Sequence, residues 1–239
     1  MSGYFDHYAA VNRLDDRGRR AHWGHYDRSI GPWMPPDRDA RILDVGCGAG
    51  LVLEWMRARG WRDARGVDVD PGQVSFARGL GLSVERADDV AAWIRALEPL
   101  DFVLLKDVLE HVPDDGVDAL LRAIASRLGP SGTLLVVVPN ANSSFAARMR
   151  HIDPTHHRLY SEHSLRWVLA RAGLGTVSVS GDDVWVPTSA MQAMKIPVKA
   201  AFRALRRLEA LAEFGWDALG MPLSPNMVAV ARPAGNGRG

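Results

Sequence analysis

The sequence is poor in cysteine and has no long hydrophobic run. A single cysteine, Cys47, cannot form an internal disulfide, and this scarcity fits a reducing compartment. No segment approaches the roughly 20 consecutive apolar residues of a membrane span. The first residues also lack the apolar core of a signal peptide. We therefore expect a cytoplasmic protein without stable membrane insertion.

An excess of charge of either sign is missing as well. The 239 residues carry a formal net charge of +1, which gives no bulk electrostatic footprint for nucleic acid. Hydrophobic residues make up 47% of the chain, an ordinary share for a globular protein, and the length is ample for a sizeable core. We expect one main domain with an insertion or a small appendage. The sequence leaves the oligomeric state undecided, and a homodimer is one alternative.

From residue 41 onward, short apolar runs alternate with amphipathic stretches, which is typical of βαβ units and a parallel sheet. The predicted strands are 41–45, 64–69, 82–87, 101–105, 133–138, 176–180 and 226–231. The predicted helices are 51–59, 71–79, 90–97, 114–128, 161–172 and 196–212. Residues 1–40 are expected to form a helical cap, 139–160 a loop, and 185–223 a helical insertion.

The segment "ILDVGCGAG", residues 42–50, places a strand before three glycines at alternate positions. Glycines at such a turn let a ligand approach the backbone closely. The spacing differs from the G-x-G-x-x-G of dinucleotide sites, and Asp44 would repel a pyrophosphate. A carboxylate there favours a cationic nucleoside such as S-adenosylmethionine, whose own carboxylate can use the helix N-terminus.

Two later acids supply contacts for a nucleoside. Asp68 ends the second predicted strand, 18 residues after Gly50 (68 − 50), close to the offset of about 20 at which an acid accepts hydrogen bonds from ribose hydroxyls. Asp70 is the better cap for the next helix, which leaves Asp68 for the ribose. Asp88, at the end of the third strand, could accept from the adenine amino group.

The motifs "LDVGCGAG", "GVDVD", "DVLEHV", "GPSGTLLVVVPN" and "HRLYSEHSLRWVLARAGL" occur in an order that resembles class I S-adenosylmethionine-dependent methyltransferases. The resemblance is greatest to the small-molecule and glycan-associated branch that includes ubiquinone-type O-methyltransferases. It implies an α/β fold with a Rossmann-like, seven-stranded, mostly parallel sheet of order 3-2-1-4-5-7-6, whose last strand is antiparallel. The methyltransferase domain is expected over 41–239, with a lid at about 185–223. The expected cofactor-binding residues are Asp44, Gly46, Gly48, Asp68, Val69, Asp88, Asp89 and Lys106.

Two histidines are the candidate catalytic residues. His111 follows the fourth strand, where ligands bind in open α/β sheets, and its imidazole could take a proton from a hydroxyl at neutral pH. His156 lies in "HIDPTHHRLY" and, with Tyr160, is expected to contact substrate. Asp107 and His157 are alternative bases. The histidine spacings in this segment match no metal signature, so no metal site is predicted.

The acceptor is inferred by exclusion. No Asn/Asp-Pro-Pro-Tyr/Phe clamp for amino groups follows the fourth strand, and no cysteine for covalent attack on cytosine stands there. A hydroxyl oxygen of a small molecule or glycan remains. The alternatives are an NAD(P)-dependent oxidoreductase and a non-catalytic binding module that keeps the cofactor fold.

The helix predicted over 196–212 is amphipathic, and its basic residues lie within 195–207. Its basic residues could touch anionic lipid or an acidic substrate. A charged outer face is the usual finding, so we expect its apolar side to pack on the sheet edge or to form a lid. That apolar side is made of Val198, Phe202, Leu205, Leu208 and Ala212.

Overall fold

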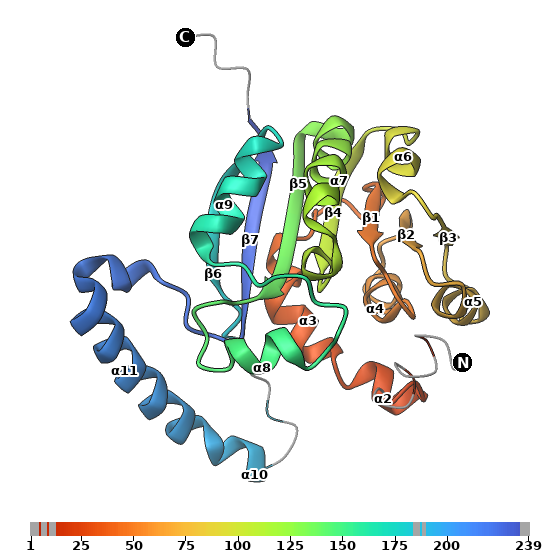
Figure 1. The fold of residues 1–239 in the computed structure, drawn as a ribbon. Coiled ribbons are helices and arrows are strands. Elements are labelled where there is room, and N and C mark those ends of the chain that lie inside the picture. Colours follow the sequence, from red (N-terminus) through yellow and green to blue (C-terminus); the bar gives the residue numbers. More distant parts are fainter. Residues whose placement is uncertain (1–4, 6–8, 10–12, 184–186, 188–189, 235–239) are drawn as a thin grey trace.

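The computed structural model describes residues 5, 9, 13–183, 187 and 190–234 (Figure 1). The strands are β1 (Ile42–Val45), β2 (Ala64–Asp68), β3 (Val84–Arg86), β4 (Leu100–Lys106), β5 (Leu128–Pro139), β6 (Leu174–Gly181) and β7 (Asn226–Pro233). The helices are α2 (Asp16–Arg20), α3 (Trp23–Ser29), α4 (Leu51–Ala58), α5 (Pro71–Gly79), α6 (Val90–Arg95), α7 (Asp114–Arg127), α8 (Ala146–His151), α9 (Glu162–Arg171), α10 (Ala190–Ala193) and α11 (Lys195–Phe214). Short 3-10 helices are η1 (Gly31–Trp33), η2 (Leu109–His111) and η3 (Gly215–Gly220).

The strands form one seven-stranded sheet of order β3-β2-β1-β4-β5-β7-β6. All neighbouring pairs up to β5 are parallel, and β7 is antiparallel to both β5 and β6. The predicted order and the antiparallel last strand are confirmed. Because parallel strands share a direction, the carboxyl ends of β1, β2 and β4 lie at one edge, where ligands bind in such sheets.

Helices cover both faces of the sheet. One core joins α6, α7 and α9 to residues of the central strands. The other core joins α3, α4 and α5 to the opposite face, with the rings of Trp55 and Trp61 5.5 Å apart. The central strands are buried on both sides, as their continuous apolar runs predict. Helix α11 belongs to neither core, and Figure 1 shows it lying apart from the sheet.

The N-terminal segment is attached to this framework by a buried ion pair. The Arg19 guanidinium donates to both carboxylate oxygens of Glu54 on α4, at 2.9 and 3.3 Å. Nearby, the Trp55 indole N–H donates to Asp27 at 2.8 Å. The helices of residues 13–40 are therefore fixed against α4, whereas most of residues 1–12 lie outside the described part.

Most predicted boundaries differ from the structure by one or two residues, and one differs by more. Strand β5 begins at Leu128 and not at Thr133, because Leu128 pairs with Leu100 of β4 before a register shift. Helix α7 accordingly ends at Arg127. The predicted loop 139–160 also contains a helix, α8. Residues 184–186 and 188–189 of the predicted insertion lie outside the described residues.

Candidate functional site

A cavity of about 710 Å³ opens at the carboxyl ends of β1, β2 and β4. Its size falls within the range of small-molecule sites. Every residue predicted to bind the cofactor lines it: Asp44, Gly46, Gly48, Asp68, Val69, Asp88, Asp89 and Lys106. His111 lines it as well. The residues between 187 and 223 that the structure describes contribute nothing to its lining.

The glycine turn after β1 forms one wall of the cavity. Gly46 and Gly48 have φ angles of +68° and +53°, a left-handed conformation that favours glycine. A Cβ at Gly46 would lie 2.6 Å from Val108, and one at Gly48 would lie 2.7 Å from the Gln73 side-chain oxygen. The turn therefore needs glycine for its backbone conformation and for space.

Asp44 is an unusual acid because it is fully buried at the end of β1. No described residue donates a hydrogen bond to its Oδ2 atom. Burial raises the pKa of Asp44 to about 7, with Lys106 opposing the shift and Asp68 adding to it. A buried acceptor without a donor, at the wall of a cavity, fits a ligand that brings its own cationic donor.

Asp68 is held in one orientation by the backbone. Its Oδ2 accepts from the N–H of Gly48 at 2.8 Å, and its Oδ1 accepts from the N–H of Asp70 at 2.9 Å. Each oxygen keeps a second lone pair for a ligand hydroxyl. Asp70 caps α5 by accepting from the N–H of Gln73 at 2.8 Å, as predicted.

The two acids after β3 have different surroundings. The Asp88 carboxylate pairs with Arg86 and its side chain is 78% exposed. Asp89 accepts from the N–H of Ala92 at 2.8 Å and so caps α6. Asp88 thus has the more accessible oxygens, while Asp89 is already used by the fold.

The end of β4 carries a strained residue. Asp107 has a φ of +55°, the one positive value among the described non-glycine residues. Its carboxylate pairs with the Lys106 ammonium. Aspartate tolerates this conformation better than most residues, and strain of this kind clusters at functional sites.

His111 is part of a chain of hydrogen bonds that leads away from the cavity. Its Nδ1 lies 2.7 Å from the hydroxyl oxygen of Thr155. That hydroxyl donates to Asp153 at 2.6 Å, and the Thr155 N–H donates to the same Asp153 oxygen at 2.8 Å. Because the single hydroxyl proton is given to Asp153, the Thr155 oxygen accepts from Nδ1–H of His111. Nε2 of His111 is therefore the nitrogen without a proton.

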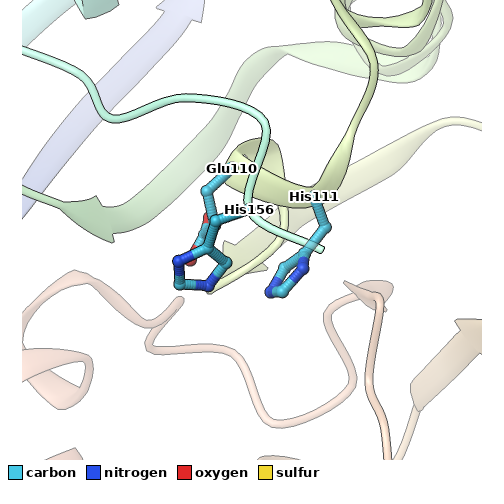
Figure 2. A group of neighbouring side chains, drawn as sticks. All are labelled: Glu110, His111 and His156. Carbon is cyan, nitrogen blue, oxygen red and sulfur yellow. The ribbon is translucent and has the colours of Figure 1, made fainter. Parts of the chain in front are cut away.

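His156 lies beside His111 and outside the cavity lining. Figure 2 shows the two imidazoles next to each other, with Glu110 beside His156. The ring centroids are 4.6 Å apart and nearly perpendicular. His156 is buried, and its Nδ1 donates to the Met149 carbonyl at 2.6 Å. Its predicted role as a base in contact with substrate is not supported by this placement.

Glu110, His111 and His156 form a group that could hold a divalent cation. One ligand atom from each lies within 4.8 Å of the others. Burial, and then Asp107, raise the pKa of Glu110 to about 8, and its Oε2 accepts no hydrogen bond from the described residues. A carboxylate and two imidazoles suit zinc and similar metals. The sequence did not indicate this group, because Glu110 and His111 lie in one segment and His156 in another. The absence of a bound metal stays a prediction.

The contact with substrate predicted for Tyr160 is not supported by its position. Tyr160 is fully buried, its hydroxyl lies 3.5 Å from the Leu109 carbonyl, and it does not reach the cavity. His157 is exposed, and its backbone N–H donates to the Glu110 carbonyl. Burial raises the pKa of the Cys47 thiol, so this residue fills the turn as an unreactive side chain.

Three polar residues of the lining were not predicted from the sequence: Tyr26, Gln73 and Thr155. Tyr26 comes from α3, which shows that the N-terminal segment closes one side of the cavity. Gln73 stands in the first turn of α5, near Asp70. The only sequence feature that indicated Gln73 was its position one turn after the helix cap Asp70. No sequence feature indicated Thr155.

Comparisons with known proteins find a matching family and several relatives. The profile of the family described as "Methyltransferase domain" matches residues 17–179. The ubiquinone biosynthesis O-methyltransferase of Azorhizobium caulinodans is 35% identical over 153 residues, which cover 62% of this chain and 54% of that protein. The protein of the same name from Xanthomonas axonopodis is 33% identical over 161 residues, which cover 59% of this chain and 65% of that protein. The matches thus span between about half and two thirds of the length of these relatives.

A solved structure shows the same fold over almost the whole chain. A SAM-dependent methyltransferase from Archaeoglobus fulgidus superimposes with a TM-score of 0.68 and 20% identity. The match covers 96% of this chain and 99% of that one. At this identity the likeness concerns the fold.

Proposed function

The chain belongs to the methyltransferase domain family, and on that premise we propose that it transfers a methyl group from S-adenosylmethionine to a hydroxyl oxygen of a small molecule or glycan. The observation that carries the proposal is the position of His111, which lines the same cavity as Asp44 and has its Nδ1 held by Thr155, so that Nε2 is left to accept a proton. The names of the two relatives, both O-methyltransferases, support an oxygen acceptor. The family sets aside the dinucleotide-dependent oxidoreductase that the glycine turn left open.

The cavity residues fit S-adenosylmethionine. Asp44 offers its unpartnered oxygen to the ammonium of the methionine part, and Gly46 leaves the backbone open beside it. Asp68 offers its remaining lone pairs to the ribose hydroxyls, and Asp88 offers an accessible carboxylate to the adenine amino group. When bound, this cofactor supplies an electrophilic methyl group on a sulfonium.

His111 would act as the general base. Burial, together with neighbouring His156, lowers the pKa of His111, so the imidazole is neutral at pH 7 and Nε2 can accept the hydroxyl proton. The Nδ1–H group of His111 keeps its hydrogen bond to the hydroxyl oxygen of Thr155, and that hydroxyl donates to Asp153. Burial opposes the shift, but the hydrogen bonds from Thr155 lower the pKa of Asp153 and keep it charged. That negative charge stabilises the imidazolium after proton transfer.

The rest of the protein positions the reactants and excludes water. Tyr26 brings the N-terminal segment to the cavity wall, and we assign residues 1–40 as the cap that shapes it. The described residues of the 185–223 insertion do not line the cavity, and the lid expected from that segment stays a prediction.

The test measures transfer of a labelled methyl group to a panel of catechols, phenols and glycans. His111→Gln is expected to lower turnover roughly a hundredfold, because a general base contributes about that much. Its affinity for S-adenosylhomocysteine, measured by calorimetry, should stay unchanged. The matched control is His163→Gln, at an exposed histidine on α9. If the protein binds S-adenosylhomocysteine but methylates no acceptor of the panel, it is a binding module and not a methyltransferase. If His111→Gln leaves turnover unchanged, His111 is not the general base.

A further inference from the structure

Helix α11 presents its apolar side to solvent. Its hydrophobic residues recur at helical spacing, so they form one continuous face. Phe202, Leu205 and Leu208 are 64%, 62% and 63% exposed. The predicted packing of this side against the sheet edge is therefore wrong. The apolar face of α11 consists of Val198, Ala201, Phe202, Leu205, Leu208 and Ala212, all exposed.

The side of α11 that faces the protein is polar. Arg203 pairs with Asp183 at 2.8 Å, and Arg206 donates to the Asn142 carbonyl at 3.1 Å. Ala210 is the one described residue of the helix that is buried. A helix at the surface of a globular protein has the opposite arrangement, with its apolar side inward. Polar contacts thus fix α11 with its hydrophobic side outward, which explains the failed expectation.

The segments beside the helix extend the exposed apolar surface. Met191 and Met194 precede it, Phe214 is its last residue, and Trp216 and Leu219 follow it, all exposed and Trp216 to 83%. Scattered exposed hydrophobic residues are normal, but an exposed apolar face that runs along a whole helix marks an interaction site. Tryptophan and phenylalanine at the end of such a face are typical of helices that lie in the interfacial region of a bilayer.

Basic residues run beside the apolar face. Lys195 and Lys199 stand four residues apart, so they form a basic stripe along the start of the helix, and both are exposed. The helix "KIPVKAAFRALRRLEALAEF" contains five basic and two acidic residues, an excess of three positive charges (5 − 2). The whole chain carries a net charge of only +1, so this excess is a local feature.

We propose that α11, together with η3, docks on an anionic lipid surface and lies in its plane. The apolar face would enter the boundary between headgroups and acyl chains, and the basic stripe would meet the phosphates. Among the described helices, none is long and apolar enough to cross a bilayer, which leaves docking parallel to the surface. A second copy of the chain fits less well, because pairing two such helices would bring two basic stripes together.

The docking surface is connected to the active-site loop. Asn142, whose carbonyl binds Arg206, precedes α8, and α8 leads into Thr155 of the cavity wall. Phe145 and Ile152, at the two ends of α8, are exposed as well. A hydrophobic acceptor dissolved in the bilayer would therefore be presented near the segment that contains Thr155. The docking itself does not depend on the proposed methyl transfer.

Vesicle flotation with the full chain tests the proposal. The probes are vesicles of phosphatidylcholine alone and vesicles containing one-quarter phosphatidylglycerol. We expect binding to the anionic vesicles that weakens at high salt, since salt screens the basic stripe. The double variant Phe202→Ser/Leu205→Ser should lose at least tenfold in partitioning. The control is Trp167→Ser, which removes an equally exposed aromatic from α9 and should bind as wild type does.

Two further measurements make the outcome unambiguous. Lys195→Gln/Lys199→Gln should weaken binding to the anionic vesicles several-fold, and the melting curves of all variants should match wild type because the altered side chains are exposed. Absence of wild-type binding, or a Phe202→Ser/Leu205→Ser variant that binds normally, would overturn the proposal. A wild-type dimer in sedimentation that this variant converts to monomers would overturn it too, since a second copy would then cover the face.

Discussion

Asp44 makes cofactor affinity depend on pH in a way that can be calculated. Its pKa is raised to about 7, and an ammonium ligand binds the ionised carboxylate. The affinity for the ammonium ligand therefore reaches its plateau above pH 7. Below pH 7 the affinity falls about tenfold for each pH unit. At pH 6 roughly one carboxylate in eleven is ionised, so the affinity is about tenfold below its plateau. Near that pH, binding should release close to one proton.

The substitution Asp44→Asn removes the charge and keeps the shape. A hydrogen bond to a charged group is worth about 2 kcal/mol, which is roughly 30-fold in affinity at pH 8. Because the wild type is itself weakened at pH 6, the difference there shrinks to about threefold.

The assay is calorimetry with S-adenosylhomocysteine between pH 5.5 and 8.5, in buffers of different ionisation enthalpy so that released protons are counted. The control is Asp39→Asn, at an exposed carboxylate outside the cavity. A wild-type affinity that does not change between pH 5.5 and 8, or an Asp44→Asn variant with the same pH dependence as wild type, would refute the reasoning.

Three further outcomes are expected. Thr155→Val should lower turnover about tenfold and change its pH profile with little effect on cofactor affinity, because His111 loses the partner of its Nδ1; an unchanged pH profile would argue against the relay. Treatment with EDTA followed by gel filtration should leave activity intact, since a sulfonium needs no metal activation; loss that zinc or magnesium restores would assign a metal to Glu110, His111 and His156. Arg19→Ala should destabilise the protein by about 3–5 kcal/mol in denaturant melts, because it leaves Glu54 buried without its partner; a change under 1 kcal/mol would contradict that account.

The fold was predictable because its signals are local. The apolar runs of β4 and β5, the cap at Asp70 and the glycines after β1 each act within a few residues. The early start of β5 was not predictable, because Leu128 is drawn into the strand by Leu100, a partner 28 residues away in the sequence (128 − 100). Gly129 and Pro130 are consistent with the end of the helix, but nothing local indicates that the strand begins before them.

The site was predictable where it consists of strand ends. Parallel strands bring Asp44, Asp68 and Lys106 to one edge whatever the loops do. Contacts between loops carry no such rule, so the bond between His111 and Thr155 could not be inferred. The period of α11 gave its apolar face correctly but could not say which way that face points, because periodicity is the same for a helix turned inward or outward.

The carboxylate of Asp68 also has a mechanical consequence. By binding the N–H groups of Gly48 and Asp70, one side chain joins the loop after β1 to the loop after β2. These hydrogen bonds fix the rotamer of Asp68 before a ligand binds. Binding therefore avoids the free-energy cost of ordering this side chain, which is about 0.5–1.5 kcal/mol for a flexible one. The two loops are expected to open and close as one unit, and a ligand that touches either should slow amide hydrogen exchange in both.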